Sequence, residues 1–137
     1  MSDSPKGWLD AVDPDVPELA RATRLQERAA SVGFDWNSLA PVLAKVHEEL
    51  SELEVEIRRH SAEARLQDEL GDLLFAVVNL ARKLGVSPGT ALRGTNVKFA
   101  RRFAVIEATL AKQGRGPQDA SLEEMDAIWE QAKHDEP

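Results

Sequence analysis

With 137 residues, of which 42% are hydrophobic and 30% charged, the chain has the size and composition of one soluble globular domain. It has no Cys, which excludes disulfides, thiolate catalysis and Cys-ligated zinc, and its net charge of -7 argues against a broad surface that neutralises nucleic-acid phosphates. No apolar run approaches the roughly 18 residues that cross a bilayer, and the first residues lack a signal-peptide pattern. We therefore expect a cytoplasmic protein that binds neither membranes nor nucleic acid. A small phosphorylated ligand fits this charge if metal ions supply the positive charge.

At the beginning of the chain, apolar residues do not repeat at a regular spacing. Residues 1–16 contain Pro, Asp and Ser and are expected to form an extended arm, although Trp8 and Leu9 are apolar and could dock on the body or on a partner. Apolar residues at helical steps then predict a first helix that starts with a proline and stops at Gly33. No segment has the two-residue alternation of a strand.

Two long helices are predicted in the middle of the chain. The second helix follows an N-cap at Asn37 or Ser38 and ends in basic residues, and the third continues to Leu84. Gly71 lies inside the third helix, where a small residue between acids suggests close approach of another backbone. The apolar positions of these two helices, expected to face the core, are Leu39, Val42, Leu43, Val46, Leu50, Leu53, Ile57, Leu66, Leu70, Leu73, Leu74, Val77, Leu80, Ala81 and Leu84.

Two further helices complete the prediction. A Ser87-Pro88 start and a Gly114 stop bound the fourth helix, and Ser121 with Glu124 forms a capping box at the start of the fifth. Their expected core positions are Ala91, Leu92, Phe99, Phe103, Ile106, Leu110, Leu122, Met125, Ile128, Trp129 and Ala132. The predicted fold is all-α: a single, bundle-like domain of five helices over residues 17–134.

Acidic residues form two pairs on the second and third helices. Glu49 and Glu52 are three residues apart, as are Glu69 and Asp72, so each pair lies on one helix face, and Glu48 extends the first pair. Sixteen residues lie between Glu52 and Glu69, which is enough for a turn that brings the pairs face to face. The spacing predicts a divalent-metal cage.

The ligand types favour a hard ion in this cage. Four clustered carboxylates need a cation, and oxygen ligands without Cys or His favour Mg²⁺ or Mn²⁺ over Zn²⁺. A ferritin-like di-iron site would need Glu-x-x-His, but Ala44, Ile57 and Gln131 precede the three histidines at that spacing. A solvated Glu-rich helix face is the structural alternative, and His47 is expected to be a surface residue.

The same residues resemble a known family. Glu48-Glu49-x-x-Glu52 and Glu69-x-x-Asp72 resemble the EExxE…ExxD signature of the all-α nucleoside triphosphate pyrophosphohydrolases, and of the MazG type in particular. The resemblance runs from about Glu18 to Lys133 through LQERAASVGFDW, KVHEELSEL, DELGDLLFAVVNLARKLG, NVKFARRFAVIE and MDAIWEQAK. These stretches are similar to the second, catalytic MazG domain. MazG often carries two such domains in tandem, whereas this sequence has one.

The resemblance implies a reaction and an assembly. It implies Mg²⁺-dependent hydrolysis of a nucleoside triphosphate to the monophosphate and pyrophosphate, with Mn²⁺ as a substitute ion, as housecleaning of non-canonical or excess nucleotides. It also implies a homodimer whose helices pack across subunits. A catalytically silent helical module that senses nucleotide or binds a partner is the alternative function.

The resemblance also implies roles for individual residues. The family's metal-binding acids match Glu49, Glu52, Glu69 and Asp72, and Glu48 or Glu52 could act as the general base. Its phosphate- and nucleotide-binding positions match Lys98, Arg102, Trp129 and Lys133. Trp129 could equally be a core residue. Asn79 could contact base, sugar or a metal-bound water, or could make a capping or interhelical hydrogen bond.

Overall fold

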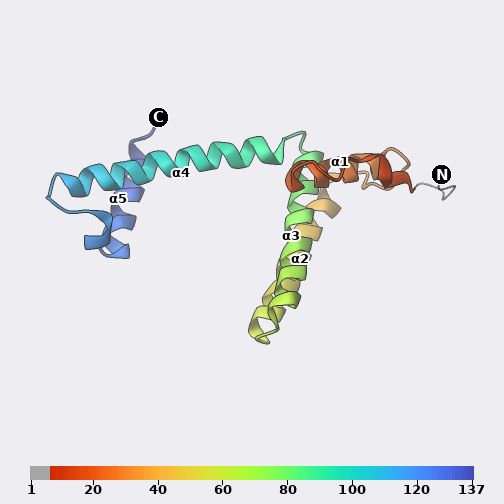
Figure 1. Ribbon diagram of the computed structural model, residues 1–137, viewed down its shortest axis with the longest axis horizontal. Helices are drawn as coiled ribbons and strands as arrows, with labels where there is room; N and C mark the ends of the chain where they lie inside the picture. Colours follow the sequence, from red (N-terminus) through yellow and green to blue (C-terminus); the bar gives the residue numbers. More distant parts are fainter. Residues whose placement is uncertain (1–6) are drawn as a thin grey trace. The chain divides into compact units, whose positions relative to one another are not determined.

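The computed structural model describes residues 7–137 and shows helices joined by short connections (Figure 1). The elements are η1 (Trp8–Ala11), α1 (Glu18–Ala30), α2 (Leu39–Arg58), α3 (Glu63–Lys83), α4 (Pro88–Ala111), η2 (Pro117–Asp119) and α5 (Leu122–Asp135). Residues 7–137 contain no strand, which confirms the predicted all-α class. None of their helices is both long and apolar enough to cross a membrane.

The chain divides into two compact units, Met1–Thr90 and Ala91–Pro137. The first contains α1, α2 and α3, and the second contains most of α4 together with α5. The extent of the single domain expected over residues 17–134 stays a prediction. Part of the expected N-terminal arm, residues 1–6, lies outside the described residues.

An antiparallel hairpin of α2 and α3 dominates the first unit, and the two helices lie side by side (Figure 1). The chain reverses at His60, whose φ of 52° is the only positive value at a non-glycine position between residues 7 and 137. The side chains buried on the two helices are Val42, Glu49, Glu56, Glu69, Ala76 and Val78. Acidic residues therefore lie on the faces by which the two helices meet.

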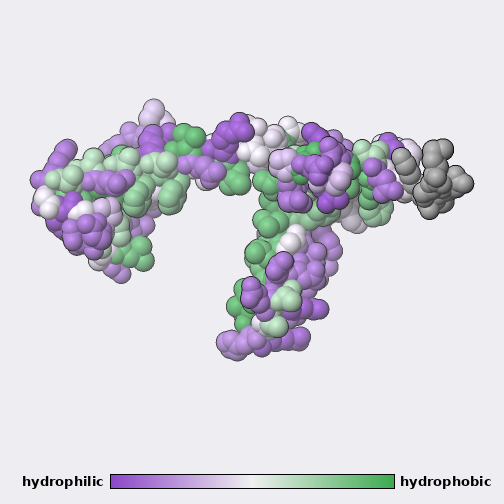
Figure 2. All heavy atoms as spheres, in the orientation of Figure 1, coloured by the Kyte–Doolittle hydropathy of each residue, from purple (hydrophilic) through white to green (hydrophobic). Residues whose placement is uncertain are grey.

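Much of the apolar stripe of this hairpin is exposed, so the expectation that it lies in the core was wrong at those positions, whereas Val42 is buried as expected. Leu50 is 49% exposed and Leu74 is 53% exposed. Leu50 follows Glu49, and Leu70 follows Glu69, by one residue, which is a rotation of about 100° away from the buried face. Because the helices are antiparallel, this rotation carries both stripes to the same side of the hairpin, and Figure 2 shows apolar residues gathered along one side of it.

Polar contacts with α3 hold two segments in place: one comes from α1, and the other from the loop before α2. Gln26 of α1 is buried, and its Nε2 donates to the backbone oxygen of Phe75 at 3.0 Å. In the loop before α2, Asp35 accepts hydrogen bonds from Arg82 at 2.6 and 3.2 Å and from Lys83 at 3.3 Å. The Arg82 hydrogen bonds are the main reason why the pKa of Asp35 lies far below its usual range.

The start of the chain is also in contact with α1. Trp8 Nε1 donates to the backbone oxygen of Arg28 at 2.8 Å, and the guanidinium carbon of Arg28 lies 3.5 Å from the centre of the Trp8 ring. This contact places Trp8 on the body of its own chain. The sequence left open whether Trp8 docks there or on a partner. Residues 8–11 form a 3-10 turn rather than extended chain.

The second unit is held together by a small apolar core. Leu110 is fully buried, Ile106 is 3% exposed and Ala132 of α5 is 8% exposed. The Phe99 and Trp129 rings lie 5.3 Å apart between centroids, which is typical of a favourable aromatic pair. Phe99 is nevertheless 58% exposed, and Leu92 and Leu122 are 50% and 74% exposed, so the expectation that these three residues lie in the core was wrong.

Local signals set several helix ends, although Ser38, the N-cap residue of α2, makes no side-chain capping hydrogen bond. The hydroxyl oxygens of Ser87 and Ser121 each accept a backbone N–H three residues on, at 3.2 Å. The expected capping box at Ser121 is only half formed, because the Glu124 carboxylate pairs with Arg115. No described atom lies within 4 Å of a Cβ built on Gly71, so the expected close approach of another backbone is absent among residues 7–137.

Candidate metal centre and phosphate-binding residues

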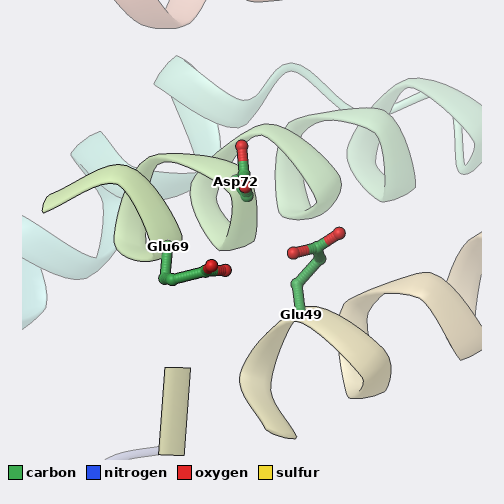
Figure 3. A group of neighbouring side chains, drawn as sticks. All are labelled: Glu49, Glu69 and Asp72. Atoms are coloured by element: carbon green, nitrogen blue, oxygen red, sulfur yellow. The ribbon is translucent and has the colours of Figure 1, made fainter. Parts of the chain in front are cut away.

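Three of the four predicted metal-binding acids meet between α2 and α3. Glu49 comes from α2, and Glu69 and Asp72 come from α3, where a three-residue spacing puts them on one face (Figure 3). Each contributes a carboxylate oxygen, and these oxygens all lie within 4.8 Å of one another. Glu49 is 7% exposed and Glu69 is 8% exposed, whereas Asp72 is exposed to solvent.

Two carboxylate oxygens of this three-acid cluster could still accept a hydrogen bond or bind a cation. Glu49 Oε2 and Glu69 Oε2 are both buried without a hydrogen-bond partner in the described part of the chain. Burial of a charged carboxylate oxygen without a hydrogen-bond or ionic partner costs on the order of several kcal/mol of folding free energy. A hard divalent cation prefers oxygen ligands of this kind, so the residues fit such an ion.

Two basic residues that sequence reasoning missed partly neutralise the cluster. Lys45 Nζ lies 3.1 Å from Glu49 Oε1, and Arg65 Nη2 lies 3.6 Å from oxygens of both Glu56 and Glu69. The Glu49 hydrogen bond is the main cause of the raised pKa of Lys45. The signal was present in the sequence, because Lys45 with Glu49 and Arg65 with Glu69 are four-residue pairs on one helix face.

The other two acids of the motif lie at the edge of this cluster. Glu52 is exposed, and the negative charge of Glu49 is the largest cause of its raised pKa, followed by desolvation. Glu69 and Glu48 add further negative charge. Glu48 is also exposed, and its carboxylate lies 3.4 Å from Lys45 Nζ. Glu52 is therefore within electrostatic range of the cluster, although it is not one of the three grouped acids.

Asn79 forms a hydrogen bond within its own helix. Its Oδ1 accepts from Arg82 Nη2 at 2.8 Å and from Arg82 Nε at 3.1 Å. Arg82 in turn pairs with Asp35, so Asn79 belongs to the network that fixes the loop before α2.

Two of the predicted substrate-binding residues meet in the second unit. The Arg102 guanidinium carbon of α4 lies 5.3 Å from the centre of the Trp129 ring of α5. Arg102 also donates to Glu136 at 3.0 and 2.8 Å. Lys98, one helical turn before Arg102, and Lys133, one turn after Trp129, are both exposed.

Comparison with known proteins identifies a family. Residues 37–104, which include all five motif acids, match the model of the MazG nucleotide pyrophosphohydrolase domain. The chain is 45% identical over 129 residues to a protein of Escherichia coli (strain K12) named nucleoside triphosphate pyrophosphohydrolase. It is 42% identical over 125 residues to the nucleoside triphosphate pyrophosphohydrolase/pyrophosphatase MazG of Thermotoga maritima. It is also 44% identical over 133 residues to the uncharacterized protein YabN of Bacillus subtilis.

These relatives are longer than this chain. The matches cover 93%, 91% and 97% of this chain, but only 49%, 48% and 27% of the respective relatives. The chain thus spans about half the length of the two named pyrophosphohydrolases.

Proposed function

Because the match over residues 37–104 makes this chain a member of the MazG nucleotide pyrophosphohydrolase family, we propose that it hydrolyses nucleoside triphosphates to monophosphates and pyrophosphate. The three-acid cluster is the observation that carries the proposal. It lies inside the matched segment, it contains only oxygen ligands, and two of its buried oxygens have no hydrogen-bond partner among residues 7–137. The expected role is removal of non-canonical or excess nucleotides.

The metal would be held by Glu49, Glu69 and Asp72, with Glu52 at the edge. When bound, Mg²⁺ or Mn²⁺ would supply Lewis-acid polarisation of the phosphate and of the attacking water. Glu52 or Glu48 would accept the proton of that water, because both carboxylates are exposed and border the cluster.

The basic residues of the second unit would bind the phosphate chain. Arg102 offers a planar guanidinium that matches phosphate oxygens, and Lys98 lies one helical turn away on the same side of α4. Lys133 would add a further positive charge. The Trp129 ring would contact the nucleotide, and Asn79 would contact base, sugar or water.

A second copy of this chain would cover the apolar face of the α2–α3 hairpin. Its exposed members are Leu39, Leu43, Leu50, Ile57, Leu70, Leu74, Val77 and Leu84. A contiguous apolar face of this kind typically marks an interaction site. We propose a homodimer in which these faces pack together.

Product identification tests the reaction. The protein is incubated with Mg²⁺ and a panel of canonical and modified nucleoside triphosphates, and pyrophosphate and orthophosphate are measured separately. Pyrophosphate and the monophosphate are expected in equal amounts. Orthophosphate release would mean that a different phosphoanhydride bond is cleaved, and no release with any nucleotide would favour the catalytically silent sensing or partner-binding module.

A further inference from the structure

Arg102 already binds an anionic group of its own chain. Its Nε donates to Glu136 Oε1 at 3.0 Å and its Nη2 donates to Glu136 Oε2 at 2.8 Å, so the carboxylate occupies one edge of the guanidinium in a two-point contact. The Arg102 side chain is 12% exposed and the Glu136 side chain 23% exposed. Arg101 Nη2 adds a contact to Glu136 at 3.1 Å.

Trp129 of α5 lies near the Arg102 guanidinium that Glu136 contacts. The Trp129 ring lies 5.3 Å from the guanidinium carbon, and Trp129 and Glu136 are seven residues apart, or about two helical turns. The Arg102 hydrogen bond is the main cause that lowers the pKa of Glu136 to about 2. Glu136 is therefore ionised at neutral pH.

Glu136 can leave Arg102 without disrupting a helix. It is the residue directly after α5, and its backbone is extended, with φ −72° and ψ 142°. Rotation about the bonds of Glu136 moves its carboxylate but breaks no hydrogen bond within α5. A phosphate oxygen pair has the same two-point match to a guanidinium as a carboxylate. Both anions cannot use the same edge, and side by side they would repel.

We propose that Glu136 is an internal competitor for the phosphate chain, which occupies Arg102 until a polyphosphate displaces it. This inference rests on the phosphate-binding role proposed above for Arg102. Glu136 then sets the affinity of the site: a polyphosphate must replace both hydrogen bonds of the carboxylate, so binding is weaker than Arg102 alone would allow.

Direct binding of pyrophosphate tests the competition. Magnesium pyrophosphate is titrated into the full chain by calorimetry, with wild type, Glu136→Gln and Glu130→Gln. Glu130 is a matched control, since it is an exposed carboxylate of α5 whose charge also reaches Arg102. Glu136→Gln is expected to bind roughly tenfold more tightly than wild type, because removal of the charge weakens the competing hydrogen bonds. Glu130→Gln is expected to change the affinity by less than about threefold.

Two results would overturn the inference. One is equal or weaker binding by Glu136→Gln, which would make Glu136 a positioning residue for Arg102 or a bystander. The other is no pyrophosphate binding by any variant. Thermal unfolding followed by circular dichroism checks that the variants fold, and Glu136→Asp, which keeps the charge but shortens the side chain, should tighten binding to a smaller extent.

Turnover distinguishes this inference from the proposed function. Tighter binding by Glu136→Gln in a protein that hydrolyses no nucleotide would contradict the proposed reaction alone. Hydrolysis with unchanged pyrophosphate affinity would contradict the competition alone.

Discussion

At the scale of single residues, Asp35 connects the loop before α2 to the end of α3. It pairs with both Arg82 and Lys83, and its side chain is 24% exposed. The same arginine holds Asn79, so one carboxylate orients a basic residue and an amide next to it on α3. Loss of this carboxylate would release the loop and the Arg82 side chain together.

The depressed pKa of Asp35 predicts a dependence of stability on pH. A carboxyl group whose pKa is lower in the folded than in the unfolded chain stabilises the fold above its unfolded pKa of about 3.9, and this contribution is lost as the pH falls towards the folded value. Asp35→Asn should lower the free energy of unfolding by about 1 to 2 kcal/mol at pH 7. Below about pH 4 the difference from wild type should shrink.

Urea unfolding at pH 7, 4 and 2 measures this difference. Asp126→Asn, which removes an exposed carboxylate of α5, serves as the control and should have little effect. A difference between Asp35→Asn and wild type that stays constant from pH 7 to pH 2 would show that the ion pair does not contribute through the charge of Asp35.

At the scale of the elements, helix ends were predictable because their causes are local. Ser87 and Ser121 accept the expected backbone hydrogen bonds, and Gly33, Gly85 and Gly114 have positive φ values at helix ends, where glycine has no steric cost. The acid spacing was predictable for the same reason, since three residues along a helix fix a common face.

The buried face of α2 and α3 could not be predicted, because it depends on what covers it, whereas Ile106, Leu110 and Ala132 of the second unit are buried as predicted. Apolar residues at helical spacing identify an apolar stripe on a helix. Their spacing is the same whether the stripe is covered by the same chain or by another chain. In the α2–α3 hairpin the helices meet through Val42, Glu49, Glu69 and Ala76, while Leu50 and its stripe are exposed. Of the basic contacts beside the acids, only the one between Arg65 and Glu56 crosses between the helices, so it depends on the same packing.

Gly71 gives a stability prediction for α3. A Cβ at this position would meet no described atom within 4 Å, so Gly71→Ala should stabilise the helix by up to about 1 kcal/mol. Gly94→Ala, at an equally open position in α4, is the matched variant. Urea unfolding checks both. Stabilisation by Gly94→Ala but destabilisation by Gly71→Ala would indicate that another chain approaches Gly71.

At the scale of the whole molecule, the exposed apolar face of the hairpin predicts self-association. Leu50→Glu places a charge on this face and should give a monomer at micromolar concentration. Val55→Glu changes an equally exposed residue, at 43% against 49%, on the other side of α2 and should leave the dimer intact. Size-exclusion chromatography with light scattering gives the masses. Wild-type protein that is monomeric and fully active would contradict the proposed dimer.

The most direct test of the central claim is pyrophosphate release by a protein that lacks one acid of the cluster. Asp72→Asn keeps the size of the side chain but removes its charge, and it should lower Mg²⁺-dependent pyrophosphate release by at least about 100-fold. Glu63→Gln, which changes an exposed acid in the first turn of the same helix, should retain activity. Equal loss in both variants, or unchanged release by Asp72→Asn, would contradict the assignment of the cluster as the metal centre.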